Sequence, residues 1–401
     1  MLPTDTRSPA SVDPAAHAPI KVLVIANYAP EGQTSMLAYS RLLETALPPQ
    51  GCEVRVLAPP QRVLRASHAA RWGKWLGYVD KFVLFVPTLR AAARWADVVH
   101  VADHSNAMYI PRLRARPYVI TCHDVIAIQA AHGMVPGWQV GATGRLFQRL
   151  IEKGLARADA VACASDFTRR DLLALDIADP QRVTTVTNGL NADFVALDHA
   201  SAQARIAGFG IGVHSRYLLH VGSDLARKNR QAVLDTFIAL RARAGDGHAS
   251  AAPVDELVFV GAPLSATMQA QAVAHGVEGR IRILHGVSHE ELNALYSRAE
   301  ALLFPSLNEG FGWPVIEAQA CGCPVFTSDL APMNEIGGTA ARYVDPHDAQ
   351  AMADAICNAR SAAGEMRRLG LDNALHYSPQ ALGAAFVALY RRVMAQRKDS
   401  A

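Results

Sequence analysis

The stretch "KVLVIANYAPEGQTSMLAYSRLLETAL", residues 21–47, decides the fold class. Residues 21–28 form a continuous apolar run, which is typical of a strand buried on both faces of a parallel sheet. A loop follows at 29–35, and residues 36–47 have the pattern of a helix. A strand, a loop and a helix in this order form a βα unit, from which parallel sheets are built.

Similar short apolar runs recur along the chain, with helical patterns before or between most of them. Strands are predicted in the first half at 52–59, 97–103, 118–124, 160–165 and 182–189, and in the second half at 217–223, 256–262, 281–286, 301–306 and 324–329. Short buried strands that alternate with helices indicate doubly wound parallel sheets. The predicted fold class is therefore α/β, with two doubly wound, Rossmann-like domains that face a cleft.

The domain boundaries follow from segments without a strand pattern. Residues 191–215 contain several glycines and no strand run, so we place the hinge there. We expect a disordered leader at 1–19, a first domain at 20–195, a second domain at 196–377 and a terminal helix at 378–401, whose pattern is amphipathic. The leader lacks the apolar segment of a secretory signal.

The composition excludes several classes of protein. The chain has 401 residues, of which 50% are hydrophobic, so it can bury a large core. Its net charge of +3 is too small for a nucleic-acid-binding protein. No apolar run reaches the eighteen or so residues of a membrane span. Six cysteines without framework spacing indicate reduced thiols in a cytoplasmic protein.

Two adjacent cations, Arg227 and Lys228, follow the predicted strand 217–223 and precede a helix. Ligands of doubly wound sheets bind outside the carboxyl ends of the strands. Two cations with helix amides behind them suit a diphosphate, although an exposed basic turn would have the same sequence.

A glycine-rich loop and two glutamates follow the predicted strand 301–306. Glu309 precedes Gly310, Phe311 and Gly312, whose amides could approach a ligand closely. Pro314 is expected as the first residue of a helix and Glu317 in its first turn, where helix capping is an alternative role for the carboxylate. Capping does not explain Glu309.

Two further features are local. His123 ends the predicted strand 118–124, where it is either a structural histidine or a ligand-binding one that faces the cleft. Ser288 and Glu291 predict a capping box for a helix at 289–298.

The segments "TCHD" (121–124), "TNGL" (187–190), "HVGSDLARKN" (220–229) and 286–325, which ends in "NEGFGWPVIEAQACGCPV", together resemble the family-4 retaining glycosyltransferases of GT-B fold. The resemblance covers nearly all of the chain after residue 20. It implies that the first domain is the acceptor side, that the second binds a nucleotide sugar, and that the terminal helix crosses back onto the first domain.

The resemblance also implies roles for individual residues. They are catalytic roles for Glu309 and His123, diphosphate binding by Arg227, Lys228 and Gly32, backbone contacts to donor sugar and phosphate by Gly310, Phe311 and Gly312, ribose binding by Glu317, and base binding by Gly286 and Val287. Two departures concern the phosphate contacts. Many members have a double glycine where this chain has only Gly32, and Ser223 stands where arginine is common.

The mechanism expected from the resemblance is front-face attack with retention, without a covalent enzyme intermediate. No general base is identifiable. The chain has no Asp-x-Asp and no His/Cys ligand cluster, so a metal-dependent site is disfavoured and the cations 227 and 228 would take the role of the metal. No cofactor is expected apart from the nucleotide sugar as co-substrate.

Residues 62–95 contain seven Lys or Arg, one acid and several aromatic residues. This composition suits an anionic membrane surface and a lipid-linked acceptor, while ordinary helix packing is the alternative. The expected localisation is cytoplasmic, with a candidate peripheral position at the inner membrane face.

The predicted function is transfer of a hexosyl unit, mannosyl or glucosyl, from a UDP- or GDP-sugar to a glycan or lipid-linked acceptor in cell-surface polysaccharide synthesis. The alternatives are a sugar-nucleotide epimerase or hydrolase on the same fold, and a nucleotide-sugar-binding scaffold without turnover.

Overall fold

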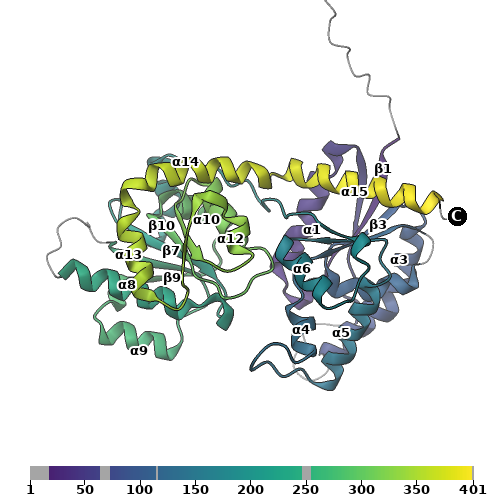
Figure 1. Cartoon of the computed structure of the whole chain (residues 1–401), viewed down its shortest axis with the longest axis horizontal. Coiled ribbons are helices and arrows are strands. Elements are labelled where there is room, and N and C mark those ends of the chain that lie inside the picture. The colour runs from purple at the N-terminus through teal and green to yellow at the C-terminus, as the bar shows by residue number, and fades with distance from the viewer. Residues whose placement is uncertain (1–17, 64–72, 114–115, 246–253, 400–401) are drawn as a thin grey trace, which may run out of the picture.

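The structure is a computed structural model that describes residues 18–63, 73–113, 116–245 and 254–399. Most of the predicted leader, residues 1–17, lies outside the described residues. Two lobes lie side by side, each with a sheet between layers of helices (Figure 1).

The first lobe is built on a six-stranded sheet with strand order β2-β1-β3-β4-β5-β6. All of its neighbouring strands are parallel. The strands are β1 (Ile20–Ile25), β2 (Cys52–Leu57), β3 (Val98–Val101), β4 (Tyr118–Cys122), β5 (Ala160–Cys163) and β6 (Val183–Thr185). Val22 of β1 pairs with Val54 on one side and Val98 on the other, which makes β1 a central strand, as its continuous apolar sequence predicts.

The second lobe repeats this design with strand order β12-β11-β10-β7-β8-β9, again parallel throughout. Its strands are β7 (Tyr217–Gly222), β8 (Glu256–Gly261), β9 (Ile281–Leu284), β10 (Ala301–Phe304), β11 (Val325–Ser328) and β12 (Ala341–Val344). The sequence reading missed β12. This edge strand exposes Arg342 and so lacks a continuous apolar run.

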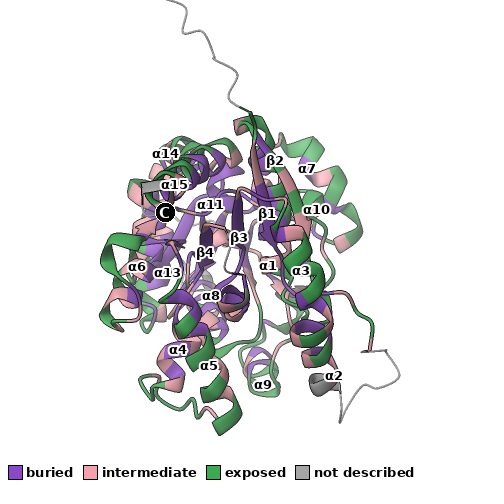
Figure 2. Cartoon of the chain, turned by 90° about the vertical axis from the view of Figure 1, so that its right-hand side faces the viewer, coloured by how far each residue is buried: buried purple, intermediate pink, exposed green. Residues whose placement is uncertain are grey.

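Helices cover both faces of the sheets, and the sheets form the buried interior (Figures 1 and 2). The helices are α1 (Thr34–Ala46), α2 (Gly73–Val79), α3 (Phe85–Ala93), α4 (Ile126–Ala131), α5 (Ala142–Leu155), α6 (Asp166–Ala174), α7 (His199–Ile206), α8 (Arg230–Gly245), α9 (Ala266–Ala274), α10 (His289–Arg298), α11 (Trp313–Ala320), α12 (Met333–Ile336), α13 (Ala349–Asn358), α14 (Ala363–Ala374) and α15 (Pro379–Asp399). Shorter segments include the π-helical η4 (Asp80–Leu84) and the 3-10 segments η5 (His104–Arg112) and η8 (Ala226–Lys228). Two doubly wound α/β sheets are the predicted fold class, which is confirmed.

The capping box predicted from Ser288 and Glu291 is present at the start of α10.

The segment 191–215 is less irregular than predicted, because it contains α7. The side chain of Asp198 accepts a hydrogen bond from the amide of Ser201 and so starts this helix. Ala202 and Ile206 of α7 are buried in the core of the second lobe. The boundary between residues 195 and 196 stays a prediction.

Only part of the surface predicted at 62–95 can be compared with the structure, because residues 64–72 lie outside the described residues. Lys81 was counted as a membrane-facing cation, and this is wrong. Its ammonium is buried and lies 2.8 Å from the carboxylate of Glu31. Asp80 is also buried and accepts a hydrogen bond of 2.7 Å from the hydroxyl of Tyr28. No helix in the described parts of the chain is both long enough and apolar enough to span a bilayer.

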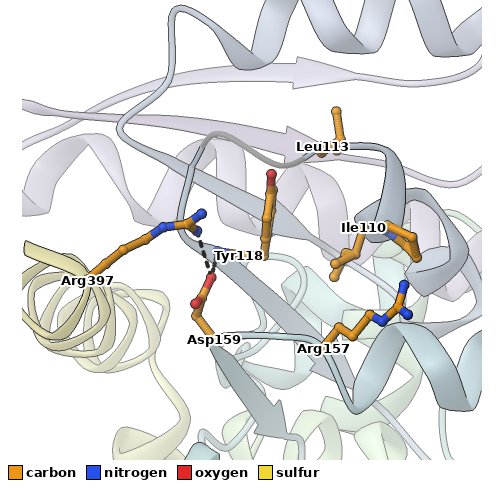
Figure 3. A pocket seen from close by; sticks show the side chains of 7 residues that line it. Ile110, Leu113, Tyr118, Arg157, Asp159 and Arg397 are labelled. Carbon is orange, nitrogen blue, oxygen red and sulfur yellow. Dashed lines mark hydrogen bonds and ion pairs between the residues drawn. The ribbon is translucent and has the colours of Figure 1, made fainter. Parts of the chain in front are cut away.

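The terminal helix α15 lies on the first lobe and packs against α1 (Figure 1). Near its end, the guanidinium of Arg397 lies 3.2 Å from the carboxylate of Asp159 (Figure 3). Both residues line a cavity of about 420 Å³ beside Tyr118, at the amino ends of β4 and β5. This cavity is therefore at the edge of the sheet opposite to the expected ligand site.

A buried hydrogen-bonded histidine joins α15 to the centre of the first sheet. His100 of β3 lies 2.7 Å from the hydroxyl of Tyr390 through Nδ1 and 2.8 Å from the hydroxyl of Thr121 through Nε2. Burial lowers the pKa of His100 to about 3, so the ring is neutral at physiological pH. Both ring nitrogens have partners, as a buried polar group requires.

We expect Tyr390→Phe to lower the free energy of unfolding by about 1–3 kcal/mol, because the ring packing is kept while Nδ1 of His100 loses its partner. Urea denaturation measures this loss. Tyr377→Phe is the matched control, since the Tyr377 hydroxyl is less buried and makes a longer bond of 3.3 Å, to the carbonyl of Ile336. An effect of Tyr390→Phe no larger than that of the control would contradict the structural role of His100.

Candidate functional site

A cavity of about 550 Å³ lies between the two lobes, at the carboxyl ends of both sheets. Loops that follow β4 and β6 of the first lobe and β7 and β10 of the second contribute to its wall, as ligand sites of doubly wound sheets do. The cavity brings together most of the predicted site residues: His123, Arg227, Lys228, Glu309, Gly310, Phe311, Gly312 and Glu317.

Glu309 is the centre of a buried ion-pair cluster in this cavity. Its carboxylate oxygens lie 2.6 Å from Nη1 of Arg227 and 2.6 Å from Nζ of Lys228. The hydroxyl of Ser306 donates a third hydrogen bond of 2.6 Å to the same carboxylate. The predicted cations and the predicted glutamate, which are about eighty positions apart in sequence, therefore form one unit.

The charge state of Glu309 follows from these partners. Burial alone would raise the pKa of the carboxyl group, but the charges of Lys228 and Arg227 hold it below its ordinary value. Glu309 is therefore ionised. A carboxylate with a depressed pKa and three donors is a poor proton acceptor, and its geometry fits the positioning of the two cations.

The glycine loop after Glu309 lies directly against the first lobe. A Cβ atom at Gly310 would lie only 2.1 Å from the carbonyl oxygen of His123, so only glycine fits there. The carbonyl of Gly310 also accepts a hydrogen bond of 2.9 Å from the hydroxyl of Ser165. This close approach joins the two lobes at the cavity.

The start of α11 differs by one residue from the prediction. The helix begins at Trp313, with Gly312 as its N-cap at a positive φ of 101°, and Pro314 is the second residue. Glu317 is consequently the fifth residue of α11, and the prediction that it lies in the first turn is wrong. Its carboxylate does not cap the helix, which removes the capping alternative for this residue.

Glu317 is buried and partly satisfied. The hydroxyl of Tyr296 donates a hydrogen bond of 2.9 Å to its carboxylate. Burial raises the pKa of Glu317 to about 7, against smaller lowering effects from Tyr296, Lys228 and Asn191. The two glutamates of the loop therefore differ: Glu309 is a fixed anion, while Glu317 titrates near neutral pH.

His123 faces the cavity with one free ring nitrogen. Its Nε2 donates a hydrogen bond of 3.0 Å to the carbonyl of Ala102, so Nε2 carries the proton. Nδ1 is buried and has no hydrogen-bond partner in the described parts of the chain. Since burial lowers the pKa of His123, the neutral ring presents Nδ1 as an acceptor for a hydroxyl group.

Two asparagines of the wall were not predicted as site residues. The side chain of Asn188 is fully buried, and neither its oxygen nor its nitrogen has a partner among the described residues. Oδ1 of Asn191 also has no hydrogen-bond partner among the described residues. Buried unpaired amides in a cavity wall are well suited to bind the hydroxyls of a polar ligand. The only sequence signal was the segment "TNGL", which contains Asn188 and carries part of the family resemblance.

Three of the predicted contacts are not part of the cavity wall. Gly32 is exposed in the loop before α1, and the wall begins at Thr34 on that side. Gly286 and Val287 precede α10, whose residues His289 and Leu292 do line the cavity. Ser223, at the position where arginine is common, lines the cavity beside Arg227 and Lys228.

Two family models match the chain, one in each lobe. Residues 38–194 match the model described as Glycosyltransferase Family 4, and residues 204–370 match Glycosyl transferases group 1. Together they span all strands of the two sheets except β1, and all of the cavity residues after Met36.

Two curated bacterial proteins are similar over most of their length. The chain is 25% identical over 299 residues to O-antigen chain mannosyltransferase B of Escherichia coli, covering 71% of this chain and 74% of the relative. It is 29% identical over 307 residues to O-antigen chain mannosyltransferase RfbU of Salmonella typhimurium, covering 76% of each chain.

Among solved structures, sucrose-phosphate synthase from Thermosynechococcus elongatus superposes with a TM-score of 0.71. The match covers 94% of this chain and all of the other, at 20% sequence identity. At this identity the similarity concerns the fold, which is of the predicted two-domain type.

We expect Glu317→Gln to stabilise the protein at about pH 8 by about 2–3 kcal/mol and to have little effect below about pH 4.5. The folded-state pKa of about 7 lies above the ordinary 4.5, so the folded protein binds the proton more tightly and loses stability as the pH rises between these values. Urea denaturation across this range measures the effect.

Glu44→Gln, on the exposed face of α1, is the control and should change stability by less than about 0.5 kcal/mol. A stability difference between the wild type and Glu317→Gln that does not change with pH would show that Glu317 is not destabilised by burial.

Proposed function

We propose that this chain, which belongs to the family-4 glycosyltransferases of GT-B fold, transfers a hexosyl unit from a UDP- or GDP-sugar to a glycan or lipid-linked acceptor with retention of configuration. The transferred sugar is mannosyl or glucosyl, and the product belongs to a cell-surface polysaccharide. The similarity to two O-antigen chain mannosyltransferases supports the mannosyl donor and the glycan product.

The observation that carries the proposal is the cluster of Arg227, Lys228 and Glu309 at the carboxyl end of β7, inside a cavity between two sheets. Cleavage of a sugar–diphosphate bond leaves about two negative charges on the leaving group. Preorganised cations at that point stabilise the charge as it develops. Arg227 and Lys228 would supply this stabilisation, and Glu309 would hold them in place before the donor binds.

The roles proposed for the remaining residues place a nucleotide sugar along a path from β7 to α11. Glu317 would accept hydrogen bonds from the ribose, and the segment around Gly286 and Val287 would hold the base. The amides of Gly310, Phe311 and Gly312 would contact the sugar and phosphates, with Gly32 approaching from the first lobe. Nδ1 of His123 would accept a hydrogen bond from a hydroxyl of the donor sugar. The side-chain amide of Asn188 is suited to hydrogen-bond a neighbouring hydroxyl.

The expected reaction is front-face displacement. The acceptor oxygen forms a bond to the anomeric carbon while the bond between that carbon and the phosphate oxygen breaks. The proton of the acceptor hydroxyl passes to the leaving phosphate, and the nucleoside diphosphate departs. No protein group needs to accept the proton in this scheme, which agrees with the ionised, fully engaged state of Glu309.

Metal independence and a cytoplasmic, peripheral membrane position are further parts of the proposal. No group of three or more His, Cys, Asp or Glu side chains suited to a metal ion occurs within the described ranges.

For the membrane surface at 62–95, Arg90 of α3 and Arg94, which follows α3, are both exposed. The side chains of the tryptophans 72 and 75 lie outside what the structure describes. Membrane contact through 62–95 therefore stays a prediction.

We expect Lys228→Ala to lower the release of nucleoside diphosphate from GDP-mannose and UDP-glucose by at least about a hundredfold, since one charged donor of this kind contributes about 3–4 kcal/mol to a transition state. Release is measured with and without a preparation of lipid-linked and glycan acceptors. Arg243→Ala, a cation at the far end of α8, is the control and should leave the rate unchanged.

Near-normal release by Lys228→Ala would contradict the proposed donor site. Release by the wild type that does not depend on acceptor would favour a hydrolase, and conversion of the sugar without release would favour an epimerase. Binding of the donor without any turnover would indicate a scaffold.

A further inference from the structure

The exposed face of helix α5 combines cations and large apolar side chains. Arg145, Arg149 and Lys153 recur every four residues, and Leu146 and Leu150 form a parallel row beside them. Leu146 is 56% exposed and Leu150 38% exposed. Large apolar side chains in a row on a surface helix are unusual, because most such residues face the core.

The opposite face of α5 is firmly packed, so the exposed row does not result from a poorly seated helix. Ile151 and Leu155 are buried in the core of the first lobe. The ring of Phe147 packs on Tyr78 of α2 at a centroid distance of 4.8 Å. The helix is therefore fixed with its second apolar row turned outward.

The segment between α4 and α5 extends this surface. Met134 is 59% exposed and Trp138 is 48% exposed, and both belong to the loop that leads into α5. We use the name α5 face for Met134 and Trp138 together with the exposed residues Arg145, Leu146, Arg149, Leu150 and Lys153 of α5. Figure 1 shows α4 and α5 together at the lower end of the first lobe, and Figure 2 shows the outer side of α5 as exposed.

The charges of the α5 face have one sign. The only acidic residue of α5 is Glu152, and its carboxylate is engaged by Nε2 of His132 at 2.8 Å. Arg149 and Lys153 form no ion pair with another residue that the structure describes. Arg145 donates to the carbonyl of Val140 and keeps its charge. Unneutralised cations beside exposed leucine and tryptophan match an anionic bilayer surface in both charge and polarity.

We propose that the α5 face docks the protein on the surface of a membrane that contains anionic lipids. The leucines and Trp138 would enter the interfacial region, and the cations would contact lipid phosphates. This surface differs from the one predicted at 62–95. His123, which lines the cavity, is separated from the start of α4 by only two residues, so docking here would bring the acceptor side of the cavity towards lipid-linked substrates.

The test is flotation of the full-length protein with vesicles of phosphatidylcholine that contain about 30% phosphatidylglycerol. We expect the wild type to float with these vesicles and not with phosphatidylcholine alone. Two variants, Leu146→Ser/Leu150→Ser and Arg149→Glu/Lys153→Glu, should each lower the floated fraction at least about tenfold. No substrate is present, so the result does not depend on the proposed transfer reaction.

Matched controls have the same changes on other surfaces. Leu371→Ser/Leu375→Ser alters exposed leucines on and after α14, and Arg391→Glu/Arg392→Glu reverses two exposed cations of α15. Both controls should float like the wild type, and the far-ultraviolet circular dichroism and thermal midpoint of all variants should match it.

Several results would overturn the proposal. They are a wild type that does not float, α5 variants that float like the wild type, controls that lose binding equally, or loss confined to Trp72→Ala/Trp75→Ala, which would assign the contact to 62–95. A wild-type dimer in light scattering that Leu146→Ser/Leu150→Ser dissociates would show that a second copy covers the α5 face instead.

Discussion

The paired contacts of Glu309 with Arg227 and Lys228 are the interaction on which the site depends. An ionised carboxylate is costly to bury unless it is paired, and an anion between two neighbouring cations offsets their repulsion. Because Glu309 follows β10 while the cations follow β7, the cluster also fixes the two strand ends relative to each other. The site is therefore organised electrostatically before a ligand enters, which lowers the reorganisation needed when charge develops on a leaving group.

Contacts between the lobes keep this cluster opposite the first sheet. Gly310 approaches His123 at a distance that no side chain would allow. The carboxylate of Glu335 accepts hydrogen bonds from the amides of Asp166 and Phe167, at 2.6 and 3.0 Å, and so caps α6 from the other lobe. The side chain of Trp313 donates to the carbonyl of Gly189. Contacts between loop and helix residues of the two lobes thus hold the lobes together beside the cavity, and α15 also packs on the first lobe.

The sequence predicted the features that local pattern determines. The apolar runs gave the central strands of both sheets, and the strand-end rule brought Arg227, Lys228, Glu309 and His123 to one edge. Prediction from the sequence failed where the local pattern is weak or where the feature depends on tertiary contacts. The edge strand β12 exposes Arg342, and α7 has Ile206 as its only large apolar residue. The position of Glu317 shifted because Gly312 rather than Trp313 caps α11. The amide of Asn188, which is buried and has no hydrogen-bond partner among the described residues, has no local signature in the sequence.

The central claim is that the cluster of Arg227, Lys228 and Glu309 is the diphosphate site of a nucleotide sugar. A crystal structure of the full chain with bound GDP-mannose or UDP-glucose tests it most directly. The account predicts diphosphate oxygens within hydrogen-bonding distance of Arg227 and Lys228, with ribose hydroxyls at Glu317. A nucleotide bound away from these side chains, or bound with its ribose remote from Glu317, would contradict it.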